Sequence, residues 1–154
     1  MKYYFIIKNN DIKDCANLPI VDEGAKNIEI TEEQFNIYKD KGLIYFKYED
    51  DEIIINPDYE ALQEQIECER INMFSLTAAD VERAIYKVKG LDFDDILELV
   101  KDNPSVDAKA LKIELKANNF YRGNPYVSTI GNLLGFTEEQ LDKFFETGNY
   151  EELM

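Results

Sequence analysis

The chain has 154 residues, of which 45% are hydrophobic and 32% are charged, so it can bury a core and is not expected to be disordered. It holds 32 acidic and 17 basic residues, which gives a net charge of −15. Residues 1–75 carry −9 and residues 76–154 carry −6, so neither half is basic. Because phosphate backbones require clustered Lys and Arg, this charge disfavours direct contact with nucleic acid or anionic membranes.

The residue types that most active sites need are scarce in this sequence. There is no His, so a Ser-His or Cys-His nucleophile pair cannot be built. The two cysteines, Cys15 and Cys68, would need carboxylates to complete a zinc site, and the 7 glycines are never spaced as a phosphate-binding loop. A pair of catalytic carboxylates is compatible with the sequence, but no spacing selects one. We therefore predict a protein without catalytic residues, metal or cofactor.

The acidic run at residues 49–52 is the one segment that invites comparison with a calcium loop. A calcium loop alternates its ligands and uses a Gly for the sharp turn, and this run has neither feature. We interpret it as the charged tip of a β-hairpin.

The sequence contains no apolar run near the ~20 residues of a membrane span. The first apolar segment, at residues 3–7, is too short for a signal peptide and is followed by no small-residue cleavage site. We expect the chain to be made and kept in a cytoplasm.

The first 57 residues favour a small mixed α/β unit. Thr31 and Gln34 have the spacing of a capping box, and Gly42 is placed to end the helix that the box begins. Apolar and polar residues alternate on both sides of the acidic run, which is typical of a hairpin. The expected elements are a strand at 3–8, an irregular stretch at 11–27, a short strand at 28–30, a helix to residue 41, and hairpin strands at 43–49 and 52–56.

From residue 58 onward the apolar period becomes helical. Capping residues followed by an apolar residue at the staple position recur before several segments, as in Thr77 with Val81 and Thr137 with Leu141. Gly90, the pair 103–104 and Gly135 then mark helix ends. The expected helices are a long one at 58–74 and five more that begin after Thr77, Asp92, Ser105, Asn124 and Thr137.

These elements predict an α+β protein in three parts. A small mixed α/β domain with a β-hairpin occupies residues 1–57, a linking helix occupies 58–75, and an all-helical domain of about five helices occupies 76–154.

Aromatic residues and an Arg gather in the predicted loop before the fourth helix of the last domain. Phe120, Tyr121, Arg122 and Tyr126 are of the types enriched at protein interfaces, which makes them the candidate protein-contact residues. Aromatic rings serve equally well as anchors that hold a loop to its core. Both interpretations stay open from the sequence alone.

The segment 129–141 has the spacing of a DNA-binding helix-turn-helix. Its second helix would then face the phosphates with an acidic surface that Lys143 alone offsets. A tight helical hairpin is the better interpretation on this charge argument. The acids concerned are Glu138, Glu139, Asp142 and Glu146.

Two segments resemble small accessory proteins encoded in the tail module of phages and prophages of Gram-positive bacteria. One is Met-Lys-Tyr-Tyr-Phe-Ile-Ile-Lys-Asn-Asn at residues 1–10, and the other is Leu-Leu-Gly-Phe-Thr-Glu-Glu-Gln-Leu-Asp-Lys-Phe-Phe at 133–145. The resemblance implies a virion-assembly or tail-associated role through contacts with other tail components, in the host cytoplasm or in the virion. The helical half departs from the pattern in its length and acidity, which leaves virion component, assembly chaperone and effector open.

Two functions follow as expectations. The first is a tail-region accessory protein that binds other proteins in structure or assembly. The second is an acidic effector of the anti-defence type, which would occupy a basic nucleic-acid-binding surface of a host protein.

Overall fold

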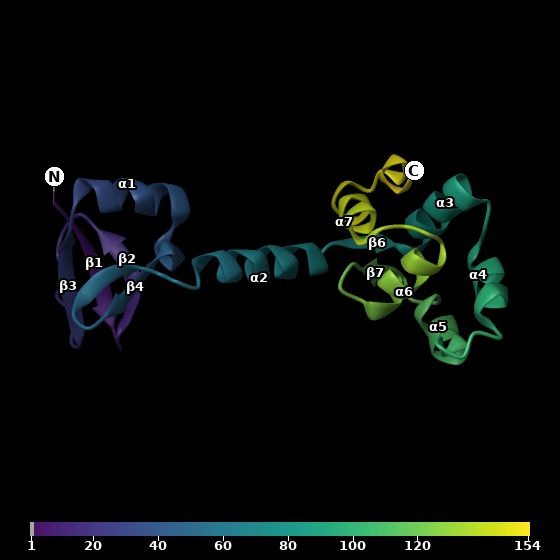
Figure 1. The fold of residues 1–154 in the computed structure, drawn as a ribbon, viewed down its shortest axis with the longest axis horizontal. Coiled ribbons are helices and arrows are strands. Elements are labelled where there is room, and N and C mark those ends of the chain that lie inside the picture. The colour runs from purple at the N-terminus through teal and green to yellow at the C-terminus, as the bar shows by residue number, and fades with distance from the viewer. Residues whose placement is uncertain (1) are drawn as a thin grey trace. The chain divides into compact units, whose positions relative to one another are not determined.

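The computed structural model describes residues 2–154 and shows a mixed α/β chain (Figure 1). Within that range it has 7 α-helices and small antiparallel sheets, which confirms the mixed class expected from the sequence. The chain divides into two compact units, unit 1 up to Gln65 and unit 2 from Ile66 to Met154. No helix in the described part of the chain combines the length and the apolar character of a membrane span.

Unit 1 contains a three-stranded antiparallel sheet with the order β2-β1-β3. Its strands are β1 (Tyr3–Lys8), β2 (Asp11–Ala16) and β3 (Ala25–Ile30). The expectation of an irregular stretch at 11–27 is therefore wrong over β2 and over residues 25–27 of β3, while residues 28–30 are a strand as predicted. Asn9 and Asn10 have φ of 55° and 59°. Two consecutive left-handed residues make the tight turn that matches strand twist, so the chain returns at once instead of ending in a loop.

The capped helix of unit 1, α1 (Glu32–Lys41), lies beside the sheet (Figure 1). Thr31 and Gln34 form the capping box that was predicted. The predicted strand at 43–49 begins late, because Leu43–Tyr45 form a short 3-10 helix, η1, before β4 (Phe46–Glu49). The side chain of Asn56 donates to the carbonyl of Ile44 over 2.9 Å, which holds this turn against the end of β5 (Glu52–Ile55).

Apolar side chains from both sheets and from α1 form the core of unit 1. The rings of Tyr3 and Phe35 stack with centroids 3.5 Å apart, which joins β1 to α1. The buried residues of this core are Phe5, Ile7, Ile12, Ile30, Phe46 and Tyr48.

The long helix predicted at 58–74 is α2 (Tyr59–Asn72), and none of its side chains is buried. It begins two residues after Pro57, within the span expected from the change of period.

Unit 2 holds the five further helices expected from the sequence, together with a short two-stranded ladder that was not expected. Thr77, Asp92 and Thr137 cap their helices as predicted, and the fourth helix begins at Pro125 as predicted, with Asn124 as its cap. The third helix is capped by Asp107 instead of Ser105. The helices are α3 (Ala78–Lys89), α4 (Phe93–Val100), α5 (Ala108–Glu114), α6 (Pro125–Leu133) and α7 (Glu138–Thr147), followed by a 3-10 turn, η2 (Tyr150–Leu153).

The ladder corrects the expectation that residues 76–154 are entirely helical. It pairs β6 (Ser75–Thr77) with β7 (Asn119–Tyr121), and Leu76 lies opposite Phe120. Burial of Phe120 at 4% exposure turns the predicted loop into a strand, because a buried extended segment must satisfy its backbone groups by pairing.

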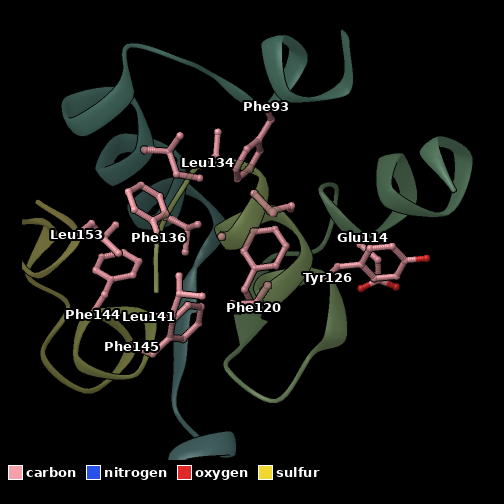
Figure 2. Close-up of a pocket in the computed structure, with 15 residues that line it drawn as sticks. Phe93, Glu114, Phe120, Tyr126, Leu134, Phe136, Leu141, Phe144, Phe145 and Leu153 are labelled. Carbon is pink, nitrogen blue, oxygen red and sulfur yellow. The ribbon is translucent and has the colours of Figure 1, made fainter. Parts of the chain in front are cut away.

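The helices of unit 2 enclose an apolar core in which aromatic rings meet (Figure 2). Phe93 and Phe120 meet edge to face with centroids 5.8 Å apart, and Phe144 and Phe145 do the same over 5.6 Å. At Gly131 the α6 and α7 helices approach so closely that a Cβ would lie 2.4 Å from Leu141 Cδ1.

We expect Gly131→Ala to lower the free energy of unfolding by about 1–3 kcal/mol, because the added methyl forces Leu141 and α7 aside. Thr129→Ala on the same helix is the control and should change it by about 0.5 kcal/mol or less. Urea unfolding followed by far-UV circular dichroism measures both variants. Equal midpoints for Gly131→Ala and the parent chain would contradict the tight α6–α7 contact.

Candidate protein-contact site

The structure separates the four residues that the sequence placed together in one contact patch. Phe120 is 4% exposed and belongs to the core, and Arg122 is 7% exposed. Tyr121 is 56% exposed and Tyr126 is half-buried. Successive side chains of an extended segment point to opposite sides, so Phe120 in β7 and Arg122 just after it point inward, and Tyr121 points outward. Only the two tyrosines are positioned to meet a partner.

Arg122 is the buried cation of unit 2 and joins β7 to the α6–α7 pair. Its Nε donates to Asp142 Oδ1 over 2.6 Å, and its Nη2 donates to Glu138 Oε2 over 2.6 Å. Its Nη1 donates to the hydroxyl of Ser128 over 3.0 Å. A guanidinium with all three nitrogens engaged is a structural clamp, since charge-assisted bonds of this kind fix geometry as well as charge.

Glu138 receives bonds from three side chains in this cluster. Ser128 Oγ donates to Oε2 over 2.8 Å, and Asn132 Nδ2 donates to Oε1 over 3.3 Å. The Ser128 hydroxyl, followed by the Arg122 guanidinium, holds the pKa of Glu138 below its ordinary value. A carboxylate kept ionised in this way is unsuited to general acid work, and its bonds to Arg122, Ser128 and Asn132 support the fold.

A surface hollow of about 610 Å³ lies beside the clamp, entirely within unit 2. Met73 is 78% exposed, and together with Tyr121 it supplies exposed apolar surface. Met and Tyr are both enriched where proteins meet. The hollow is lined by Asn72, Met73, Glu114, Tyr121, Gly123, Asn124, Pro125 and Tyr126.

Backbone and cap contacts build the rim of this hollow. Gly123 N donates to Asn72 O over 3.1 Å, and a Cβ at residue 123 would lie 2.9 Å from the Asn72 Cβ, so the close approach requires glycine. Asn124 Oδ1 accepts from Tyr126 N over 3.0 Å and so begins α6. Its Nδ2 donates to Glu114 Oε2 over 2.8 Å, which draws the end of α5 to the same rim.

Glu114 and Tyr126 also line a second, inner cavity that opens among the core rings (Figure 2). Its volume is about 40 Å³, far below the roughly 300–1,000 Å³ of small-molecule sites. The inner cavity is a packing gap of the core and is too small for a ligand of that size.

The acidic clusters singled out in the sequence do not assemble a metal site. In residues 2–154 no group of three or more Cys, Asp or Glu side chains is arranged to hold a metal ion. At the tip of the β4–β5 hairpin, Asp51 Oδ1 accepts from Lys26 Nζ over 2.6 Å and from the Tyr48 hydroxyl over 2.5 Å. These bonds, the one from Lys26 foremost, hold the pKa of Asp51 below its ordinary value.

Unit 1 has an exposed apolar loop that the sequence reasoning missed. Leu18 is 71% exposed and Val21 is fully exposed. The backbone of Ile20 is held at both ends by one side chain, because Ile20 N donates to Asn27 Oδ1 over 2.8 Å and Asn27 Nδ2 donates to Ile20 O over 2.9 Å. The run Leu-Pro-Ile-Val at 18–21 could have indicated this exposed apolar surface, because it lies in a stretch that was expected to be irregular.

Removal of the buried clamp tests its structural role. We expect Arg122→Ala to lower the free energy of unfolding by about 3 kcal/mol, because Glu138 and Asp142 lose their common cation. Arg83→Ala is the matched control, since Arg83 is 71% exposed in its pair with Asp80 and should contribute about 0.5 kcal/mol or less. Chemical unfolding of both variants measures the difference, and similar losses would contradict the clamp.

The lowered pKa of Glu138 also predicts a dependence of stability on pH. A carboxyl whose pKa is lower in the folded state contributes stability above its unfolded pKa, and this contribution is lost as the pH falls through the folded pKa. We expect Glu138→Gln to lose less stability than the parent chain between pH 5 and acid conditions. Thermal melts across this range measure it, and parallel curves for the two chains would refute the assignment.

Comparisons with protein-family models, with curated proteins and with solved structures gave no significant match, so the function is argued from the geometry of the chain itself.

Proposed function

We propose that this chain is a protein-binding protein with a structural or assembly role, and that its partner docks at the hollow of unit 2. The observation that carries the proposal is the outward placement of Met73 and Tyr121 beside half-buried Tyr126, in a hollow whose rim is held by hydrogen bonds. Tyr is among the residues that carry most of the binding energy at protein interfaces, and Met is enriched there.

The Arg122 clamp favours binding of a partner at the hollow, because it holds the segment that carries Tyr121. Tyr121 follows Phe120 and precedes Arg122, so both of its neighbours in the chain are anchored in the interior. A side chain on such a segment loses little further freedom when a partner binds, and this raises affinity without any additional contact.

The exposed loop of unit 1 adds a second surface on a separate compact unit. Lys8 Nζ binds Asp22 Oδ2 over 2.9 Å just after the loop, and Asn27 holds Ile20 within it. A chain with one exposed apolar surface on each unit is suited to join two partners, as an assembly factor or minor structural component must. The resemblance of residues 1–10 and 133–145 to tail-module proteins of phages supports that setting.

A second function, the acidic effector that covers a basic nucleic-acid-binding surface, is favoured by the charge of −15. The first turn of α4 carries Asp94 and Asp95 after the capping Asp92 and displays this charge. Binding of that kind rests on charge and weakens steeply as salt rises, whereas binding anchored by Tyr121 and Met73 falls much less.

A photo-crosslinking amino acid at position 121 tests the proposal in cells that express the full chain. We expect covalent adducts with a discrete protein when it replaces Tyr121, and none when it replaces Tyr86, which is 64% exposed but does not line the hollow. Tyr121→Ser should weaken capture of that protein by about tenfold or more, as for a central interface residue.

Two results would overturn the proposal. One is equal crosslinking from positions 121 and 86, and the other is capture that Tyr121→Ser leaves unchanged. Capture that disappears at 0.5 M salt in the parent chain would favour the effector. Mass spectrometry of purified phage particles would then separate a virion component from an assembly factor that is left behind.

A further inference from the structure

We infer that the hollow of unit 2 receives a basic side chain, Lys or Arg, as the anchor of the partner polypeptide. The inference rests on the proposed function, since it names the chemistry that the same hollow would recognise. It is drawn from three lining groups, the carboxylate of Glu114 and the rings of Tyr121 and Tyr126.

Glu114 is a half-buried carboxylate with an incomplete set of partners. Asn124 Nδ2 binds its Oε2 over 2.8 Å and so fixes its orientation. Among the described residues no Lys or Arg pairs with Glu114, and none donates to its Oε1. None of the residues that line the hollow is basic. A partly desolvated charge without a counterion favours a cation from outside.

The tyrosines complete a recess of the kind that holds cations. Aromatic faces attract ammonium and guanidinium groups through their quadrupole. The chain already uses this contact internally, since Arg70 lies over Phe74 with its Cζ 5.0 Å from the ring centroid and Lys87 lies over Tyr150 with its Nζ 4.1 Å away.

The lining of the hollow suits a long basic side chain, because it combines apolar surface with one carboxylate. Met73 and Pro125 offer apolar surface for the aliphatic stem of Lys or Arg, while the charged head meets Glu114. Other occupants fit less well. Carboxylates and phosphates would be repelled by Glu114, and a purely aliphatic side chain would leave this carboxylate buried without a cation. A second copy of the chain would bring a further charge of −15.

Titration of the full chain with blocked tripeptides, followed by ¹⁵N–¹H nuclear magnetic resonance, tests the inference. The probes are acetyl-Gly-Arg-Gly-amide and acetyl-Gly-Lys-Gly-amide, with Gln and norleucine peptides as neutral controls of similar length. We expect saturable shifts at residues 114, 121–124 and 126 from the basic peptides, with the neutral peptides binding about fivefold more weakly or worse.

Two variants separate local recognition from general attraction. Glu114→Gln should weaken the Arg peptide by about fivefold, whereas Glu33→Gln removes one charge outside the hollow and should leave its affinity unchanged. Equal effects of the two variants, shifts scattered over the surface, or norleucine binding as tightly as Arg would each overturn the basic anchor.

The outcome is independent of the crosslinking result. Adducts at position 121 without selective binding of basic peptides would keep the proposed function and remove the basic anchor. Failure of both experiments would remove both.

Discussion

The buried guanidinium of Arg122 is the constraint on which unit 2 depends. It enters the interior just after β7 and binds Asp142 and Glu138 of α7 and Ser128 of α6, so one side chain holds three successive elements together. Removing the charge from water is costly, and the network is stable only because each nitrogen finds an acceptor. β7 places Tyr121 outward, so the clamp and the proposed contact surface lie on two sides of one short segment.

Helix starts were the most predictable part of the fold because their signals are local. Thr31, Asp92 and Thr137 each form the reciprocal capping box that their spacing indicated. Strands were harder to predict. The ladder of Ser75–Thr77 with Asn119–Tyr121 joins segments more than 40 residues apart, and neither is long enough to show an alternating pattern.

The candidate site was predictable only in part, for the same reason. Tyr121 and Tyr126 stood out as aromatic residues in one short segment, but which rings face solvent follows from the pairing of β7. Met73 and Glu114 lie at the hollow because of two contacts, Gly123 with Asn72 and Asn124 with Glu114. No pattern in the sequence indicates either contact. Residue types in the sequence therefore indicated the segment 120–126, whereas contacts between distant residues determined which of its side chains line the hollow.

Glu114 and Tyr126 form a shared wall between the outer hollow and the small cavity in the core. A partner that holds these two side chains also restrains the packing behind them, so the bound form of unit 2 must unfold less readily than the free form. Copies that have found their place would resist proteases, while surplus copies would be degraded first. Under the proposed function, such selective turnover would adjust the amount of this protein to the number of sites that a partner offers.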